Sequence, residues 1–250
     1  MEDDFKAVKS ELLKTKDVSD QALEKLGLDL EEIKKVTKVI LKEWDDKRVA
    51  SCERGNKIHL EQEMKYVGKK DTTMEHYGLG GKFVVRDKNF DLDVDRAVYP
   101  EYLVHASYKF SNLDVVVNLA GQSDLVVKDM SDIFIRDYKT NESIDEKSFF
   151  NRRTRKHKRM LFPVSNMMDC NLYHYALQLS MYGLMIQTLK PDLNIAKLTL
   201  EHHAHNGSIK DYECDYYKEE CIRIIKDYAK KTALARDKAK IKPITFFLND

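Results

Sequence analysis

Two acidic residues and a lysine flank two neighbouring apolar runs, in the segment SDLVVKDMSDIFIRDYKT from Ser123 to Thr140. Asp124 opens the first run, and Asp137 and Lys139 end the second. Side chains alternate between the two faces of a strand, so Asp137 and Lys139 share a face. If the polar turn between the runs closes a hairpin, Asp124 comes alongside Asp137. Two carboxylates and an ammonium group then meet, as in a phosphodiesterase that holds a divalent metal ion, activates water and stabilises developing charge.

A D-x-K triplet near a hairpin turn also occurs by chance on protein surfaces. Here the triplet directly follows the run Ile133–Ile135, which is typical of a strand buried in a central sheet. Charged groups are costly in a buried strand unless they are paired or bind a metal ion. The context therefore favours a catalytic role for Asp124, Asp137 and Lys139 over a solvated surface hairpin.

His59 and Glu101 are candidates from other parts of the chain. Residues 52–67 show the apolar spacing of a helix, and Gly55, one turn before His59, leaves room for a close partner. A single helical histidine is more often exposed or hydrogen-bonded than metal-bound, so both interpretations stay open. Glu101 follows Pro100 at the start of a strand-like run, and is either a further acid of the site or a charge facing water. An imidazole among carboxylates would favour manganese over magnesium.

A basic segment follows the candidate acids. The run NRRTRKHKR, residues 151–159, contains six Lys or Arg among nine residues. A solvated loop is one interpretation, but the position of the run between the site and the next helix favours contact with a phosphate backbone. Such contact is sensitive to salt and independent of base sequence. The basic residues are Arg152, Arg153, Arg155, Lys156, Lys158 and Arg159.

The clearest helix of the chain is expected over residues 169–189, where apolar residues recur with helical spacing. Gln178 and Tyr182 are four residues apart and therefore share one face of it. Their amide and hydroxyl groups are placed to brace Lys139 or to contact a nucleotide, while the other aromatic residues of the helix are expected to pack in the core.

The remaining sequence supplies the elements around these residues. A helical N-terminal region is expected over residues 1–50, and a core over residues 51–250 that ends in a helix and a Lys-rich tail. We expect helices at 5–13, 21–26, 30–47, 52–67 and 221–235, a loop at 72–81, and strands at 101–110 and 114–120, the last broken by Gly121 and Gln122. Asn206–Gly207 suits the tight turn of a hairpin formed by 195–205 and 209–217. Near its tip, His202, His203 and His205 are expected to be exposed rather than metal-bound.

Composition indicates a globular protein. The 250 residues are 42% apolar and 34% charged, and the net charge of +1 means that any affinity for nucleic acid must come from local patches. The sequence lacks a signal-peptide pattern and an apolar stretch of membrane-spanning length, so we expect a cytoplasmic protein (host-cell cytoplasm if viral) that is not secreted. Cys52, Cys170, Cys214 and Cys221 form no C-x-x-C pair and are expected to be reduced.

Five short motifs occur in order along the chain. They are GNKIH around His59, PEYLV with Glu101, AGQSDLVV with Asp124, IRDYKT with Asp137 and Lys139, and QLSMY with Gln178 and Tyr182. Together they resemble the RecB-type branch of the PD-(D/E)XK nuclease superfamily, over about residues 55–228. The resemblance implies an α/β fold with a restriction-endonuclease-like core, in which helices flank a mixed central β-sheet, and it implies metal-dependent cleavage of DNA.

The resemblance also implies a role for each matched residue. His59, Asp124 and Asp137 would ligate Mg²⁺ or Mn²⁺, helped by the Tyr138 carbonyl. Lys139 would orient or help to activate the attacking water and stabilise the transition state. Three further residues match positions that support the lysine and the substrate, or an acid whose role is less settled: Gln178, Tyr182 and Glu101.

The chain departs from some relatives in this branch in two respects. Those relatives bind an iron–sulfur cluster through one early cysteine and three closely grouped late ones. Cys52 matches the early position, but the other three are not grouped, so no cluster is expected. The sequence has no helicase P-loop, so we expect a stand-alone nuclease, or one that works with a separate helicase, recombinase or single-strand-binding protein in recombination, repair, or viral or phage genome processing.

Three functions remain compatible with these residues. The first is a DNA exonuclease or structure-selective nuclease, and the second is an RNA endonuclease of the viral cap-snatching type, which shares the order of histidine, acids and lysine. The third is a nucleic-acid-binding subunit with the same fold and a silent site. The pair Gln178 and Tyr182 favours the DNA branch, and the complete set of acids with Lys139 argues against a silent site.

Overall fold

The structure is a computed structural model, which describes residues 30–87 and 91–240. The chain divides into two compact units, residues 1–57 and 58–250, and the second contains the whole β-sheet. The helices expected at 5–13 and 21–26 lie outside the described residues. The Lys-rich tail expected after residue 235 is wrong as far as Lys240, because the last helix continues to that residue, and the rest of the tail lies outside the described residues. Within the described part of the chain, no helix combines the length and the apolar character needed to cross a membrane.

Helix α3, Leu30–Glu63, is continuous. We expected two helices here, over 30–47 and 52–67, and that division was wrong. The intervening residues Arg48–Ser51 include neither Pro nor Gly, and Gly55 inside a helix costs only about 1 kcal/mol relative to alanine. A turn follows the helix, in which Gly68 has a φ of 73°. His59 therefore lies in the last two turns of α3, within the second unit.

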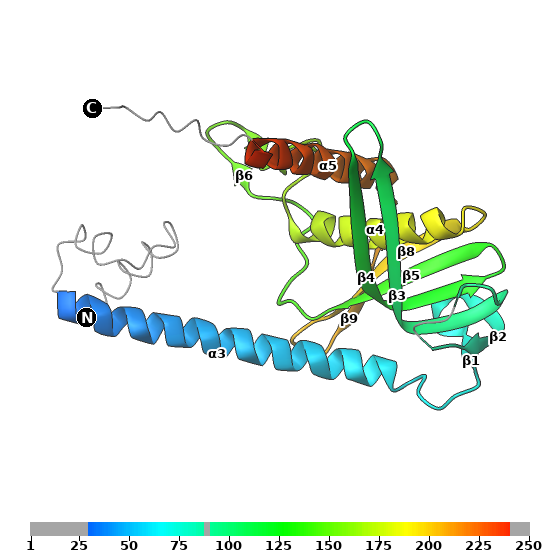
Figure 1. Cartoon of the computed structure of the whole chain (residues 1–250). Helices are drawn as coiled ribbons and strands as arrows, with labels where there is room; N and C mark the ends of the chain where they lie inside the picture. Colours follow the sequence, from blue (N-terminus) through cyan, green and yellow to red (C-terminus); the bar gives the residue numbers. More distant parts are fainter. Residues whose placement is uncertain (1–29, 88–90, 241–250) are drawn as a thin grey trace. The chain divides into compact units, whose positions relative to one another are not determined.

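Seven strands form one mixed sheet in the order β1-β2-β3-β4-β5-β8-β9 (Figure 1). The pairs β2–β3 and β5–β8 are parallel, and the other neighbours are antiparallel. This confirms the expected α/β fold with helices on a mixed central sheet. The strands are β1 Asp71–Met74, β2 Leu79–Val85, β3 Arg96–Phe110, β4 Val115–Asp129, β5 Asp132–Lys139, β8 Asn194–His203 and β9 Ile209–Cys214; β6 Phe150–Asn151 and β7 Lys156–His157 form a separate small hairpin.

Two local predictions about this sheet were wrong. The expected loop at 72–81 instead contains β1, the short 3-10 helix η1, Glu75–Tyr77, and the start of β2. The loop was predicted from the glycines of this segment. Gly78 does end η1, with a φ of 79°, but Gly80 and Gly81 belong to β2. Strand β4 also runs through Gly121 and Gln122 without a break, because both residues keep their pairing with β3.

Two helices cover one face of the sheet. Helix α4, Asn171–Leu189, buries Leu179 and Met185 against Val126 and Ile135 of the central strands. Helix α5, Lys218–Lys240, packs beside α4 on the outer part of β4 (Figure 1). On the other face a second cluster forms around Phe83, Val98 and Leu125. The side chains of β5 therefore alternate between two cores, and Asp137 and Lys139 lie on the α4 face together with Ile135.

Strand β3 changes the phase of its alternation at Glu101. Before this residue, Ala97 and Tyr99 point into the core under α4; after it, Tyr102 and Val104 do so. The inward-facing residues thus have odd numbers before Glu101 and even numbers after it. Glu101 has a φ of 52°, the left-handed conformation. This conformation rotates the backbone, so that the residues after Glu101 again direct alternate side chains into the same core. The Glu101 carboxylate is thereby set at the bend of the strand, opposite Asp124 in β4.

Candidate active site

The hairpin of β4 and β5 brings the two aspartates together. Its turn consists of Met130 and Ser131 between the paired residues Asp129 and Asp132, and Met130 has a φ of 56°. Asp124 and Asp137 lie one position beyond the last described pair, Leu125 with Arg136, so they are neighbours on adjacent strands. The hairpin expected from the sequence forms, and with it the predicted proximity of the two carboxylates.

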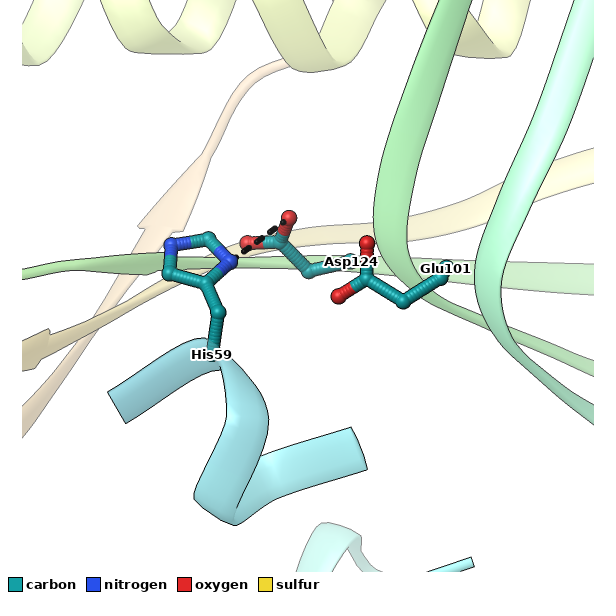
Figure 2. A group of neighbouring side chains, drawn as sticks. All are labelled: His59, Glu101 and Asp124. Atoms are coloured by element: carbon teal, nitrogen blue, oxygen red, sulfur yellow. Dashed lines mark ion pairs between the residues drawn. The ribbon is translucent and has the colours of Figure 1, made fainter. Parts of the chain in front are cut away.

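His59, Glu101 and Asp124 form a cluster of potential metal ligands, contributed by α3, β3 and β4 (Figure 2). One ligand atom from each residue lies within 4.8 Å of the other two, and His59 Nδ1 is 3.3 Å from Asp124 Oδ1. Two ligands on opposite sides of one ion are separated by about 4–5 Å, so these atoms can share an ion. No other group of this kind occurs among residues 30–87 and 91–240.

Asp124 is held in place by the backbone of β5. Its Oδ2 atom accepts a hydrogen bond of 2.6 Å from the Tyr138 amide, which leaves Oδ1 beside His59. The contact with Asp124 is therefore made by the Tyr138 amide, whereas the resemblance implied a role for the Tyr138 carbonyl; that role stays a prediction. The hydrogen bond with Asp124 raises the pKa of His59, and burial opposes this effect only in part.

Asp137 is the most deeply buried acid of the site, with 2% of its surface exposed. Its Oδ2 atom forms an ion pair with Lys139 Nζ but has no well-aligned hydrogen-bond donor. Burial and the negative charge of Asp124 raise the pKa of Asp137 to about 6, although Lys139 and His59 act in the opposite direction. Burial and Asp124 likewise raise the pKa of Glu101. The site thus concentrates negative charge that a bound cation would neutralise.

The donor set fits a divalent metal ion. It offers one imidazole nitrogen and several carboxylate oxygens, a combination that suits Mn²⁺ as well as Mg²⁺. The resemblance had implied His59, Asp124 and Asp137 as ligands. In the structure the tightest group contains Glu101 in place of Asp137, and Asp137 adjoins it on the next strand.

Lys139 is positioned by a chain of contacts from α4. Gln178 Oε1 lies 3.4 Å from Lys139 Nζ, and Gln178 Nε2 donates a hydrogen bond of 2.8 Å to the Tyr182 hydroxyl. Burial alone would lower the pKa of Lys139, but Asp137 and Asp124, with a smaller contribution from Tyr175, together keep the pKa raised. Lys139 is therefore an ammonium group at neutral pH. Of the two α4 residues selected by their four-residue spacing, Gln178 lies next to the lysine, and Tyr182 is linked to it through Gln178.

Tyr175 is a further neighbour of the lysine that we did not select from the sequence. Lys139 Nζ lies 4.7 Å from the centre of its ring, and the Tyr175 hydroxyl donates to Asn141 Oδ1 at 2.9 Å. An aromatic face near an ammonium group stabilises the charge by a cation–π contact. Spacing could have indicated this residue, because Tyr175 precedes Gln178 by three positions and so shares its helix face.

Gly121 leaves the space in which Tyr182 packs. A Cβ atom at residue 121 would lie 2.5 Å from Tyr182 Cε1 and 3.2 Å from Cδ1. We expect Gly121→Ala to lower the free energy of unfolding by about 1–3 kcal/mol, because the buried ring has to shift. Gly80→Ala is the matched control, since nothing lies within 4 Å of its Cβ position. Denaturant unfolding measures both, and equal stability of the two variants would contradict the proposed contact.

The basic run of residues 151–159 forms the exposed hairpin β6–β7. Lys158 pairs with Asp169 at 2.8 Å, and Arg159 donates to the Asn166 carbonyl at 2.7 Å. The other four cations, Arg152, Arg153, Arg155 and Lys156, make no ion pair with any residue that the structure describes. These four remain candidates for contact with phosphate groups.

The expectation of exposed histidines in the β8–β9 hairpin was wrong for two of the three. His202 and His203 are 5% and 7% exposed. His202 Nε2 bonds to the Asn141 carbonyl at 2.7 Å, and His203 Nε2 bonds to Glu201 Oε1 at 2.8 Å. Both histidines are buried by loops and strands that are distant in the sequence, which their local pattern did not reveal. His205 is exposed, as expected.

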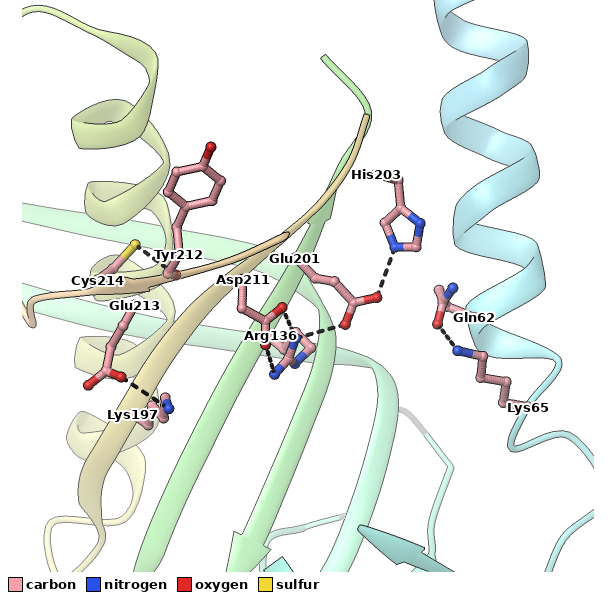
Figure 3. A network of polar contacts seen from close by, with 10 residues as sticks. All are labelled: Gln62, Lys65, Arg136, Lys197, Glu201, His203, Asp211, Tyr212, Glu213 and Cys214. Carbon is pink, nitrogen blue, oxygen red and sulfur yellow. Dashed lines mark hydrogen bonds and ion pairs between the residues drawn. The ribbon is translucent and has the colours of Figure 1, made fainter. Parts of the chain in front are cut away.

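An ion-pair network anchors β5 on the face of the sheet opposite to that of Lys139; Figure 3 shows this network around Arg136. Arg136 donates to Glu201 at 2.7 Å and holds Asp211 through two contacts of 2.7 and 2.9 Å. Its guanidinium group also stacks over the Tyr77 ring at 3.9 Å. Because Arg136 precedes Asp137 directly, this network anchors the strand that carries two residues of the candidate site.

Comparisons with known proteins add little to this geometry. No protein-family model matches the chain, and no curated protein matches it. Two solved structures are similar to it at a TM-score of 0.33: the protein SSO0001, with 13% identity, and a protein from Eubacterium rectale named "Putative exonuclease", with 12% identity. The matches cover 59% and 60% of this chain, and 52% and 49% of those proteins. The chain thus spans about half the length of each.

Proposed function

We propose that this chain is a Mg²⁺- or Mn²⁺-dependent nuclease that hydrolyses phosphodiester bonds of DNA. One observation carries the proposal: acids and a histidine from α3, β3, β4 and β5 gather at one place beside the ammonium group of Lys139. Carboxylates buried in a sheet are costly unless they bind a cation, and a neighbouring ammonium group suits a reaction that develops negative charge.

His59, Asp124 and Asp137 are the proposed metal ligands, with Glu101 and the Tyr138 carbonyl as further oxygen donors. A divalent ion held by them would polarise a phosphoryl oxygen and make water a better nucleophile. The chain itself supplies the orientation of the donors. The Tyr138 amide holds one oxygen of Asp124 and leaves the other beside His59, so the ligands are arranged before an ion binds.

Lys139 is proposed to orient the attacking water and to stabilise the charge on a non-bridging phosphate oxygen. Gln178 contacts the ammonium group and is itself bonded to the Tyr182 hydroxyl. The ring of Tyr175 lies close to the same group. These contacts restrict the directions that the flexible lysine side chain can take, which concentrates its charge where the phosphate would lie.

The finer assignment is a DNA exonuclease or structure-selective nuclease of the RecB type. The contact of Lys139 with Gln178, which is itself bonded to Tyr182, supports this choice over the cap-snatching RNA endonucleases, because the motif QLSMY resembles that of the DNA branch. We also propose that the enzyme acts inside cells, where its free cysteines would stay reduced, together with a separate helicase, recombinase or single-strand-binding protein.

Cleavage assays on a matched set of substrates test the function. We expect the full chain with Mn²⁺ or Mg²⁺ to degrade linear DNA faster than RNA of the same sequence. Circular DNA and linear DNA with both ends blocked are the controls that separate the modes of attack. Degradation of open linear DNA alone indicates an exonuclease, and cleavage of all three indicates an endonuclease. Faster cleavage of RNA, or no cleavage of any substrate, contradicts the proposal.

A further inference from the structure

The segment Ser148–Met168 exposes several large apolar side chains to solvent. We name it the aromatic-basic extension; it contains the β6–β7 hairpin and the turn that follows. Phe149, Leu161 and Phe162 are 73%, 87% and 72% exposed, and Phe150 is 46% exposed. Single exposed apolar residues are common, but four within 14 residues are an unusual concentration of apolar surface, which favours a binding role.

Hydrogen bonds order the first half of the aromatic-basic extension. Asn151 Oδ1 accepts from the Arg153 and Thr154 amides at 2.9 and 3.1 Å, which closes the tip of the hairpin. At its base the Lys158 amide donates to the Phe149 carbonyl at 2.8 Å. Phe149 is thus exposed on a defined backbone, so little conformational freedom would be lost when a ligand covers its ring.

Packing on the helices orders the second half. Met160, Val164 and Met167 are buried, and they pack against Leu177 of α4 and Ile224 of α5. Leu161 and Phe162 lie in the turn between these anchored residues, and the Val164 amide donates to the Leu161 carbonyl at 3.1 Å. The turn therefore points its two most apolar side chains away from the core that it helps to build.

The same extension carries the four cations that make no ion pair with described residues: Arg152, Arg153, Arg155 and Lys156. No acid interrupts the run from residue 151 to residue 159, in a chain whose net charge is only +1. Cations next to exposed rings match a ligand that has both negative charge and flat apolar faces.

We propose that the aromatic-basic extension binds single-stranded nucleic acid, with Phe149, Phe150 and Phe162 stacking on bases while the four cations contact phosphates. A duplex hides the faces of its bases, except at its ends, so stacking on rings requires a single strand or a frayed end. In the chain the extension lies between β5, which ends at Lys139, and α4, which starts at Asn171 and carries Gln178, so short segments connect it to two elements of the candidate site. The inference that the extension directs a substrate strand to the candidate site rests on the proposed function, whereas its binding of single-stranded nucleic acid does not.

An anionic membrane surface could also attract cations and aromatic rings. The connection of the extension to two elements of the candidate site favours nucleic acid, and the experiment distinguishes the two. Full-length protein without divalent metal is titrated into a fluorescent oligothymidine of about 20 nucleotides, a length that covers a typical single-strand site. A blunt duplex with hairpin-closed ends and vesicles of anionic phospholipid are titrated in parallel.

We expect Phe149→Ala and Phe162→Ala each to weaken oligothymidine binding by at least about fivefold, because each stacked base is lost with its ring. Their salt dependence should stay as in the parent. Replacing Arg152, Arg153 and Arg155 together by Ala should instead reduce the slope of log K against log salt concentration. The reduction is up to about 2 if the three side chains contact three phosphates of a single strand. Tyr228→Ala, an aromatic residue 59% exposed on α5, is the matched control and should bind as the parent does.

A tryptophan at position 162 gives a direct readout of stacking. The chain has one tryptophan, Trp44, so Trp44→Phe combined with Phe162→Trp leaves a single reporter. Oligothymidine should quench its fluorescence, and this variant should keep the affinity that Phe162→Ala loses.

Parent affinity in both phenylalanine variants, or no quenching, overturns the proposal. So does an equal loss of binding to the closed duplex, a loss of vesicle binding alone, or a change in oligomeric mass that shows that the rings contact a second copy. A protein that cleaves no nucleic acid yet shows the expected binding contradicts the proposed function and leaves the strand-binding surface standing.

Discussion

Asp137→Asn is expected to lower DNA cleavage by roughly a thousandfold or more, and at the same time to stabilise the metal-free protein. The loss of activity follows because the change removes a proposed metal ligand and the anion that orients Lys139. Steady-state cleavage of linear DNA at saturating Mn²⁺ measures this effect. Asp124→Asn is expected to lower cleavage by a similar factor, since it changes a carboxylate whose two oxygens contact His59 and the Tyr138 amide.

The gain in stability follows from the pKa of Asp137. Its value is about 6 in the folded protein against an ordinary value of 3.8. The folded state therefore holds a proton that the unfolded state has released, and the stability of the metal-free parent falls as pH rises through this interval. Above it, the ionised carboxylate costs up to about 3 kcal/mol, and somewhat less is recovered in Asp137→Asn because Lys139 loses its closest anion.

Thermal unfolding in the presence of a chelator checks this second effect. The variant should unfold a few degrees above the parent near neutral pH, and the difference should vanish below the ordinary pKa of an aspartate. Asp129→Asn is the matched control, a carboxylate at the far end of β4 that pairs with Arg96 at 3.0 Å. Full cleavage by Asp137→Asn, or a lower unfolding temperature near neutral pH, would disprove the assigned role of Asp137.

Removal of divalent metal is expected to abolish cleavage completely, and its return to stabilise the fold. With Mn²⁺ at about 100 times its dissociation constant, the parent should gain about 3 kcal/mol in the free energy of unfolding. Asp124→Asn should gain little stability from Mn²⁺, because the cluster of His59, Glu101 and Asp124 then loses one of its two carboxylates. Unfolding temperature against metal concentration, measured without DNA, reports on the site independently of catalysis.

The same titration tests the part played by the histidine. His59→Ala should lose more affinity for Mn²⁺ than for Mg²⁺, because imidazole nitrogen is a better ligand for the former. His105→Ala is the control, an exposed histidine of β3 outside the cluster. An unfolding temperature that does not respond to metal, or equal responses of the parent and Asp124→Asn, would exclude the proposed metal site.

The local parts of the site could be predicted from the sequence. Alternation placed Asp137 and Lys139 on one face, a two-residue turn brought Asp124 beside them, and helical spacing paired Gln178 with Tyr182. Each of these follows from a period or a short loop. The burial of His202 and His203 could not be predicted, because it depends on partners from other segments. The same holds for the continuity of β4, because Gly121 and Gln122 are held in the strand by their pairing with β3.

Glu101 marks the limit of pattern-based prediction. Side-chain alternation assumes a constant period of two, whereas β3 changes the phase of its alternation at Glu101, which has a φ of 52°. Glutamate at this position gave no signal, since left-handed residues are more often Gly or Asn. The structure places this carboxylate next to His59 and Asp124, whereas its sequence context left it as either an acid of the site or a surface charge.

This conformation also protects the strand against misalignment. If β3 slipped by one residue along β4, the left-handed position would fall to Pro100 or Tyr102. The proline ring fixes φ near −65° and forbids it, and a bulky aromatic residue adopts it only at a substantial cost. The antiparallel ribbon therefore has one favourable way to close, and that alignment is the one in which the acids of two strands face each other.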